Sequence, residues 1–189
     1  MKITDLLSKK AIQLNGTASS KEEAISKMID LMANNGNIVN KEEYKRVVMA
    51  REQEGTTGIG EGIAIPHGKC DAVTKPGLAA MVVKDGVEFD ALDGQPVTLM
   101  FLIAAPNTKD NVHLDVLSKL SVLMMDEVFA DALRNAKSAD EFLDIIDKAD
   151  AEQGDIDERL ADMNEASANG FKILAVTSCP TGIAHTYMA

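Results

Sequence analysis

The chain has 189 residues with 30 acidic and 19 basic side chains, which gives a formal net charge of −11 at pH 7. This length suits one domain of ordinary size and a remainder, and it is too short for two domains of about 150 residues each. The basic residues are interspersed with acidic ones, which argues against nucleic acid or an anionic lipid surface as the partner.

Two amphipathic helices are predicted in the first third of the chain. The first follows a pair of N-cap serines, Ser19 and Ser20, carries acids in its first turn, and ends near Gly36. The second is capped by Asn40, and its buried face is predicted to extend as far as Arg51. Arg51 would then lie close to the glycine-rich segment that follows.

This glycine-rich segment leads into a short apolar run and a histidine. Its glycines, Gly58, Gly60 and Gly62, would let backbone amides approach an anion closely. The apolar run ends at Pro66, which cannot continue a ladder, so His67 is expected at the mouth of a strand. A neutral imidazole can accept a phosphoryl group, and its ordinary pKa of about 6.5 makes that form available. The pattern suggests phosphoryl transfer to histidine, although from the residues alone a glycine-rich turn with an incidental histidine stays open.

The middle of the chain is predicted to form the sheet. Leu78 to Val83 and Val97 to Ala105 are near-continuous apolar runs, typical of strands that are covered on both faces. Between them, Asp85-Gly86 and Asp93-Gly94 are predicted to be tight turns that flank a short strand at Val87 to Phe89.

Helices are expected again after Pro106. The first has His113 in its first turn, and two more should run from about Asp126 to Ala136 and from Ser138 to about Ala149. Helices before and after buried strands predict an α/β domain, with a mixed β-sheet flanked by helices on both sides.

A shift in composition marks the end of this domain. Residues 150–170 are rich in acids, Ala, Asn and Gly, which predicts an interdomain linker that is partly helical around Ile156 to Met163. An apolar strand then resumes at Phe171 and leads to Cys179. We therefore expect a single compact domain over residues 1–149, a linker over 150–170 and a C-terminal tail over 171–189.

Two motifs resemble consecutive links of one phosphate relay. The segment from Gly58 to Gly68 resembles the phosphorylation-site signature of enzyme IIA domains of the fructose–mannitol family, from the bacterial sugar phosphotransferase system. The segment from Ser178 to Ala189 is similar to the phosphocysteine loop that opens the fructose-type enzyme IIB domain. The two motifs in this order are far more specific than either alone. The resemblance implies an enzyme IIA domain followed by the incomplete start of an enzyme IIB domain.

The resemblance also implies roles for individual residues. His67 would take phosphate from the phosphocarrier protein HPr and pass it to enzyme IIB. His113 corresponds to the second active-site histidine of the family, and Arg51 to its active-site arginine. Without the resemblance, His113 could be a surface residue of a helix, and Arg51 could simply complement the helix dipole.

Cys179 would be the phosphocysteine of the enzyme IIB fragment. It precedes a turn and the expected start of a helix, whose amides would lower the pKa of the thiol and bind phosphate. A tyrosine phosphatase uses a similar loop, but its loop needs an arginine, and none lies between Cys179 and Ala189. This favours a phosphate relay over a phosphatase.

The partners implied are HPr, enzyme IIB and, indirectly, the membrane-embedded enzyme IIC, with no nucleic acid. No cofactor or metal is expected, because the H-x-x-C spacing of His67 and Cys70 lacks a second pair of ligands. Two rival functions stay open, a regulatory IIA-like phosphoprotein and a metal-binding or hydrolytic enzyme. The sequence assigns no role to Glu61, Cys70 or His185, and it does not identify the sugar.

The chain is expected to be cytoplasmic. It begins without the features of a signal peptide, and no apolar run approaches the roughly 20 residues that a membrane helix needs. Its two cysteines are far apart and are expected to be thiols. If the chain serves a sugar transporter, the membrane part would lie beyond Ala189 or on another chain.

Overall fold

A computed structural model describes residues 2–108 and 112–166, with the backbone alone for residues 112–114 and 155–166. The chain divides into two compact units, Met1–Asp150 and Ala151–Ala189. The predicted strand at Phe171 and the loop of Cys179 lie outside the described residues. The first unit carries the whole of the described sheet.

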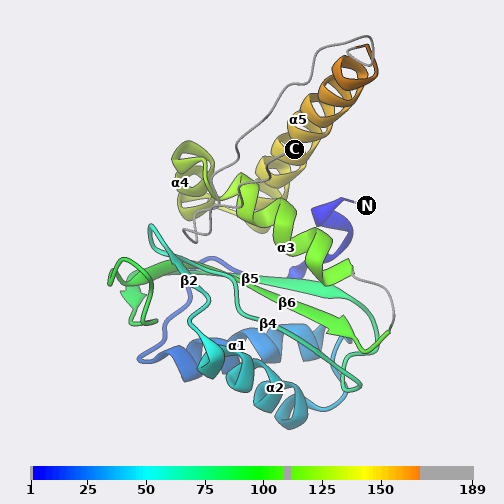
Figure 1. Ribbon diagram of the computed structural model, residues 1–189. Coiled ribbons are helices and arrows are strands. Elements are labelled where there is room, and N and C mark those ends of the chain that lie inside the picture. Colours follow the sequence, from blue (N-terminus) through cyan, green and yellow to red (C-terminus); the bar gives the residue numbers. More distant parts are fainter. Residues whose placement is uncertain (1, 109–111, 167–189) are drawn as a thin grey trace. The chain divides into compact units, whose positions relative to one another are not determined.

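That sheet has six strands and is mixed, as predicted (Figure 1). Its central strand is β6 (Val97–Pro106), which pairs antiparallel with β5 (Gly77–Val87). On the far side of β5 lies β1 (Leu7–Gln13), in parallel. On the other side of β6 lie two short parallel strands, β3 (Ile63–Ala64) and β4 (His67–Cys70), and β2 (Gly58–Gly60) pairs antiparallel with β3.

Strands β3 and β4 form one line along β6. Ala64 pairs with Met100 and His67 with Ile103, so the register does not change between the two strands. Pro66 stands between them and has no amide hydrogen to donate, but its carbonyl accepts a hydrogen bond of 3.0 Å from the amide of Ile103. Pro66 therefore separates β3 from β4 without changing their register with β6.

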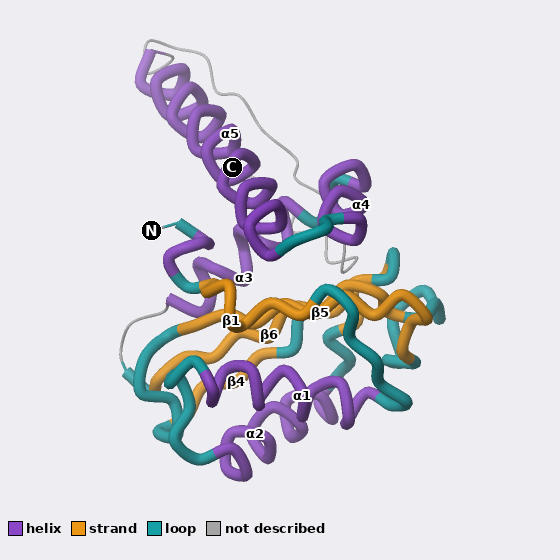
Figure 2. The backbone as a smooth tube through the Cα atoms, turned by 180° about the vertical axis from the view of Figure 1, so that it is seen from behind, coloured by secondary structure: helices purple, strands orange, loops and turns teal. Residues whose placement is uncertain are grey.

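Helices cover both faces of the sheet, as predicted (Figures 1 and 2). A short 3-10 turn, η1 (Ile3–Asp5), precedes β1. Helices α1 (Lys21–Asn34) and α2 (Lys41–Glu54) lie on one face. Helices α3 (Val112–Leu123) and α4 (Glu127–Asn135) lie on the other, with residues 139–150 of α5 (Ala139–Ala166).

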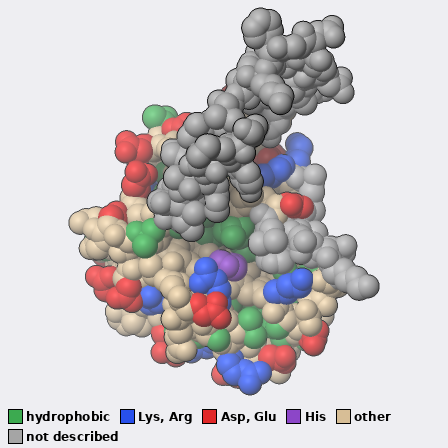
Figure 3. All heavy atoms as spheres, in the orientation of Figure 1, with side chains coloured by type: hydrophobic (Ala, Val, Ile, Leu, Met, Phe, Trp, Pro, Cys, Tyr) green, Lys and Arg blue, Asp and Glu red, His purple; other side chains and the backbone are tan. Residues whose placement is uncertain are grey.

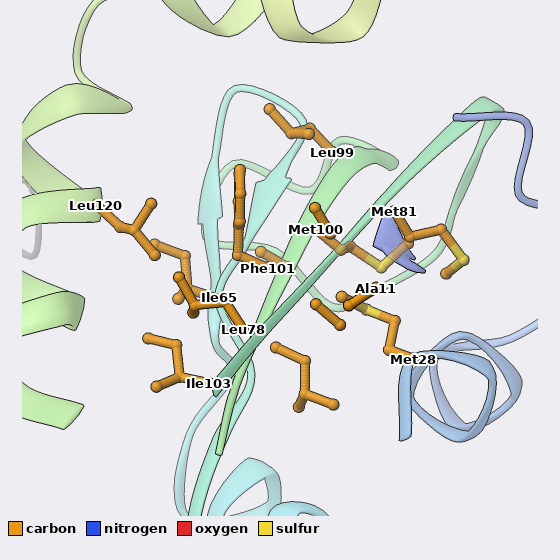
Figure 4. Packing of buried hydrophobic residues seen from close by; sticks show 14 of the residues in the cluster. Ala11, Met28, Ile65, Leu78, Met81, Leu99, Met100, Phe101, Ile103 and Leu120 are labelled. Atoms are coloured by element: carbon orange, nitrogen blue, oxygen red, sulfur yellow. The ribbon is translucent and has the colours of Figure 1, made fainter. Parts of the chain in front are cut away.

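Side chains from both layers of helices meet the strands in a continuous apolar core. Figure 4 shows Met28 of α1 beside the strands near Met81, while Leu120 of α3 projects toward the sheet from the other side. The rings of Phe101 in β6 and Phe142 in α5 lie with centroids 6.0 Å apart, and both are fully buried. The near-continuous apolar pattern of β5 and β6 follows from this burial on two faces.

The predicted helix starts are confirmed by their caps. The side chains of Ser20 and Asn40 accept hydrogen bonds from the amides three residues further on, at 3.2 and 3.1 Å. Asp126 and Ser138 do the same for α4 and α5. These side chains satisfy amides that have no partner within the helix.

Two linked predictions about the strands were wrong, the tight turn at Asp85-Gly86 and the separate short strand at Val87 to Phe89, because Val87 is the last residue of β5. Asp85-Gly86 is not a turn between strands but lies inside β5, where the register with β6 shifts between Val82 and Val87. Gly86 has φ +73°, which lets the strand take up this irregularity and continue to Val87. The turn at Asp93-Gly94 is confirmed, because the Gly94 amide donates to the Ala91 carbonyl at 2.9 Å.

The sequence analysis did not identify β1, and it ended the last helix too early. In β1 only Leu7 and Ala11 are fully buried, because the strand lies at the edge of the sheet and carries two exposed lysines. Helix α5 continues to Ala166, and over residues 150–166 of the predicted linker helix formers such as Ala, Glu, Leu and Met outnumber the one glycine, Gly154. None of the helices in the described ranges is both long and apolar enough to cross a membrane.

Replacing Phe142 by alanine should lower the free energy of unfolding by about 3–5 kcal/mol, because it opens a cavity against Phe101. Chemical denaturation measures this change. Val128→Ala is the control: Val128 is 79 % exposed, so that variant should stay within about 0.5 kcal/mol of the parent. Equal effects of the two variants would contradict the packing of α5 on the sheet.

Candidate active site

His67 is the first residue of β4 rather than the last residue of a strand. Its neighbour Gly68 faces α2, since a Cβ atom built there would lie 2.9 Å from Val48 Cγ2 and 3.1 Å from Tyr44 Cε2. Side chains alternate along a strand, so His67 points to the opposite face, on which α3 packs against β6. His67 is half-buried, which leaves the ring accessible while its surroundings hold it in place.

One hydrogen bond fixes the tautomer of the His67 ring. Nδ1 lies 3.0 Å from the carbonyl oxygen of Ile65. A carbonyl oxygen can only accept, so Nδ1 must carry the proton. In the neutral ring Nε2 then holds a free lone pair, which is the form that can attack phosphorus.

Two residues of the surrounding structure support this position. The Tyr44 hydroxyl donates a hydrogen bond of 2.8 Å to the carbonyl of Ile103, the residue that pairs with His67 across the ladder. Burial raises the pKa of Tyr44 well above its usual range, so the hydroxyl keeps its proton. Gly68 has no side chain, and this absence lets α2 approach β4 closely.

The three glycines of the predicted phosphate loop form a hairpin. Gly58 and Gly60 lie in β2, and Gly62 follows the turn with φ +71°. At the tip, the Glu61 amide donates to Asp93 at 2.8 Å, and the Glu61 carbonyl accepts from Arg134. At about 3.3 Å per strand residue, the five positions from Gly62 to His67 span about 16 Å. This span does not favour Gly62 as a phosphate ligand, whereas Gly58 pairs with Ala64 and lies closer to His67. A role for the three glycines stays a prediction.

Arg51 lies in the last turn of α2 and is half-buried. Its guanidinium donates a hydrogen bond of 3.0 Å to the carbonyl of Gly55, just beyond the helix end. This contact is what the helix-dipole alternative predicts. The fully buried face of α2 continues through Tyr44 and Val48 to Glu52, so the prediction that it extends to Arg51 was wrong.

His113 lies in the first turn of α3, as predicted, but its side chain is outside the described residues. Helix α3 packs against β6 on the face toward which His67 points. This arrangement agrees with a shared site, and the contact between the two rings stays a prediction. Cys179 and His185 lie outside the described residues.

Buried Glu52 and Thr57 form a polar cluster with half-buried Lys21, which the sequence analysis missed. The carboxylate of Glu52 accepts hydrogen bonds from the Thr57 amide at 2.9 Å and from the Thr57 hydroxyl at 2.6 Å. It also pairs with the ammonium of Lys21 at 3.3 Å. A sequence signal existed, because Glu52 follows Val48 by four positions and Tyr44 by eight, on the same helical stripe.

Neither Cys70 nor the other described side chains indicate a second functional site. Cys70 is a buried free thiol, and burial raises its pKa, which fits a packing role. Among the described residues, no group of three or more potential ligands is placed to hold a metal ion. Acidic and basic side chains are interspersed over the face in Figure 3, with no broad basic patch in view.

Comparison with known proteins identifies the family. Residues 5–149 match the family model described as "Phosphoenolpyruvate-dependent sugar phosphotransferase system, EIIA 2". The chain belongs to this family. The match covers nearly the whole of the first compact unit, including His67 and the helix that carries His113.

A curated relative and two solved structures show how close the likeness is. The "PTS system fructose-specific EIIABC component" of Bacillus subtilis is 46% identical over 189 residues, which is 100% of this chain and 30% of that relative. The crystal structure of "Nitrogen Regulatory Protein IIA-Ntr" from Neisseria meningitidis has a TM-score of 0.71 at 31% identity, covering 76% of this chain and 98% of that one. A complex of mannitol enzyme IIA with phosphorylated mannitol enzyme IIB from Escherichia coli has a TM-score of 0.66 at 30% identity. The match covers 76% of this chain and 99% of that one.

Adding a methyl group at Gly68 should separate α2 from β4. We expect Gly68→Ala to lower the free energy of unfolding by about 1–3 kcal/mol, because its Cβ would press on Val48 and Tyr44. Gly55→Ala is the matched control: its φ of 165° suits any residue, and a Cβ there would meet none of the described atoms within 4 Å. The control should differ from the parent by less than about 1 kcal/mol. An equal loss of unfolding free energy in Gly55→Ala would argue against the close approach of α2 to β4 at Gly68.

Proposed function

We propose that this chain is the enzyme IIA phosphocarrier of a sugar phosphotransferase system, with His67 as the phosphorylated residue. The observation that carries the proposal is the hydrogen bond between His67 Nδ1 and the Ile65 carbonyl, in a chain of the EIIA 2 family. It leaves Nε2 as the nucleophile on an accessible ring. HPr is the proposed donor, and a cysteine of enzyme IIB is the proposed acceptor.

In the proposed transfer, each bond formed at phosphorus is matched by a bond that breaks there. The lone pair of Nε2 forms a bond to phosphorus while the bond from phosphorus to the donor atom of HPr breaks. The ring then gains positive character, which the Ile65 carbonyl stabilises through the Nδ1 proton. In the second transfer a thiolate of enzyme IIB attacks the same phosphorus, and the electron pair returns to Nε2.

His113 and Arg51 are the proposed supporting donors. Phosphorylation adds negative charge beside His67, and donors placed before the reaction offset that charge at little reorganisation cost. The start of α3 is on the face toward which His67 points. For Arg51, the supporting role requires that its guanidinium leave or share the Gly55 carbonyl.

Enzyme IIB is the partner that the relatives favour. The Bacillus subtilis relative is named as a fused EIIABC component, and the Escherichia coli structure contains an enzyme IIA with a phosphorylated enzyme IIB. The alignment with the fused relative extends over the whole chain and so includes the Cys179 motif. We propose a fructose-type sugar, an acceptor cysteine of the Cys179 type, and a cytoplasmic position tethered to membrane-embedded enzyme IIC.

A regulatory function is the second candidate. It is favoured by the likeness to the nitrogen regulatory protein of Neisseria meningitidis at 31% identity. In that function, phosphorylation of His67 would control the binding of partners rather than supply transport. The full-length alignment with the fructose-specific relative favours the transport function, since it reaches beyond the IIA domain.

Replacing His67 by alanine should abolish acceptance of phosphate from HPr while leaving the fold intact, because the ring is half-buried and its loss opens no closed cavity. The measurement is acid-labile phosphate after incubation with phosphoenolpyruvate, the general enzyme and HPr. Lys69→Ala, two positions along the same strand, is the control and should accept one phosphate per chain. Acid-labile phosphate retained by His67→Ala would exclude His67 as the acceptor.

His113→Ala should slow the transfer by about 10–1,000-fold without abolishing it, because a supporting donor stabilises the transition state but does not attack phosphorus. Rapid-quench measurement of the transfer from phosphorylated HPr gives this rate. The final amount of phosphate bound should equal that of the parent. A rate equal to that of the parent would make His113 an ordinary surface residue.

A further inference from the structure

We propose that Glu52 is a positioning residue for His67, which acts through Thr57 and the backbone of Ile65. The inference deepens the proposed function, because it rests on His67 as the phosphorylated residue. Glu52 lies in the last turn of α2, and it touches neither the His67 ring nor any reacting atom in the described contacts. Its effect on His67 must therefore pass through the residues between them.

The first step is the buried carboxylate itself. The Glu52 side chain is 3% exposed, and each of its oxygens accepts a hydrogen bond from Thr57, one from the amide and one from the hydroxyl. Hydrogen bonds to an ionised group are shorter and stronger than neutral ones. Two such bonds to one residue fix both the backbone and the side chain of Thr57.

The second step is the counterion that keeps Glu52 charged. Lys21 reaches the carboxylate at 3.3 Å and is also paired with Asp90 at 2.8 Å, over the ring of Phe89. Burial would lower the pKa of Lys21, but Asp90 and Glu52 together raise it. The ammonium therefore stays protonated, which offsets the cost of burying the carboxylate.

The third step leads from Thr57 to the histidine ring. The carbonyl of Thr57 accepts a hydrogen bond of 3.0 Å from the Ile65 amide. The carbonyl of the same Ile65 accepts from His67 Nδ1, also at 3.0 Å. A shift of Thr57 would let Ile65 rotate, and the Ile65 carbonyl would no longer point at Nδ1.

The Ile65 and Pro66 carbonyls point to opposite sides of the strand. Pro66 separates Ile65 from His67, and its own carbonyl is engaged by the Ile103 amide. The Ile65 carbonyl points away from β6, to the side on which the Ile65 amide meets Thr57, and there it accepts from the ring. A merely structural Glu52 would stabilise the fold, whereas a positioning Glu52 must also set the tautomer of His67.

The test compares Glu52→Gln with Glu54→Gln, which removes the same charge from an exposed position two residues further along α2. Nitrogen-15 NMR of histidine-labelled protein reports which nitrogen of the neutral His67 ring carries the proton. We expect the Nδ1-protonated form to dominate in the parent and in Glu54→Gln, and to lose its dominance in Glu52→Gln. Transfer from phosphorylated HPr should have kcat about tenfold lower in Glu52→Gln, with KM changed less than about twofold.

A second variant keeps the test decisive if Glu52→Gln does not fold. Thr57→Val keeps the shape and backbone of residue 57 but removes the hydroxyl that donates to Glu52, so it should shift the tautomer in the same direction. An unchanged tautomer in every folded variant of this pair would overturn the proposal. An equal shift in Glu54→Gln would overturn it too, since a general charge effect would then be sufficient.

The two proposals fail in different ways. A parent protein that accepts no phosphate on His67 would refute the proposed function. The tautomer measurement needs no phosphate and would still decide whether Glu52 positions the ring. A parent that accepts phosphate, with tautomer and rate unaffected by Glu52→Gln, would refute only the positioning role.

Discussion

The pairing of β6 with the line formed by β3 and β4 is the interaction on which the site depends. Because the register is the same before and after Pro66, the chain from Ile63 to Cys70 stays aligned with β6 although proline interrupts the ladder. Strand β6 is buried and has β5 on its other side, so it provides a rigid support. His67 is therefore held against a buried strand that is paired on both sides.

In the proposed function, the interruption at Pro66 and the alignment with β6 meet two different needs of a phosphocarrier. A nucleophile that meets two partner proteins must be accessible, yet catalysis requires its attacking atom to be placed within a fraction of an ångström. Strand β4 pairs only with β6 within the described sheet, so His67 stands beside a free edge. The Ile65 carbonyl, which points away from β6, supplies the placement through the Nδ1 proton.

Two buried polar side chains of α2 connect that helix to the strands around His67. Tyr44 reaches β6 opposite His67, and Glu52 holds Thr57 at the start of the hairpin. Both side chains belong to α2, whose approach to β4 depends on Gly68. One helix therefore supports the histidine at two points, which explains why so short a strand can keep a defined position.

The sequence by itself determined the family and most helix boundaries, and it supplied the proposed acceptor, because these depend on local patterns. Capping side chains such as Ser20 and Asn40 bond to amides only three residues away, and the His67 motif is contiguous. It also predicted two buried strands, since burial on both faces leaves long apolar runs.

Only the tertiary structure decided which polar residues are buried and which glycines approach the histidine. Glu52 sits among charged residues at a helix end, and its burial depends on Lys21 and Thr57, which come from other segments. Gly60 and Gly62 are close to His67 in the sequence but lie toward the far end of the hairpin, whereas Gly58 returns to a position opposite Ala64. Edge strand β1 was missed for the same reason, because its burial depends on a pairing with β5 about 70 residues away along the chain, as Leu7 with Leu78.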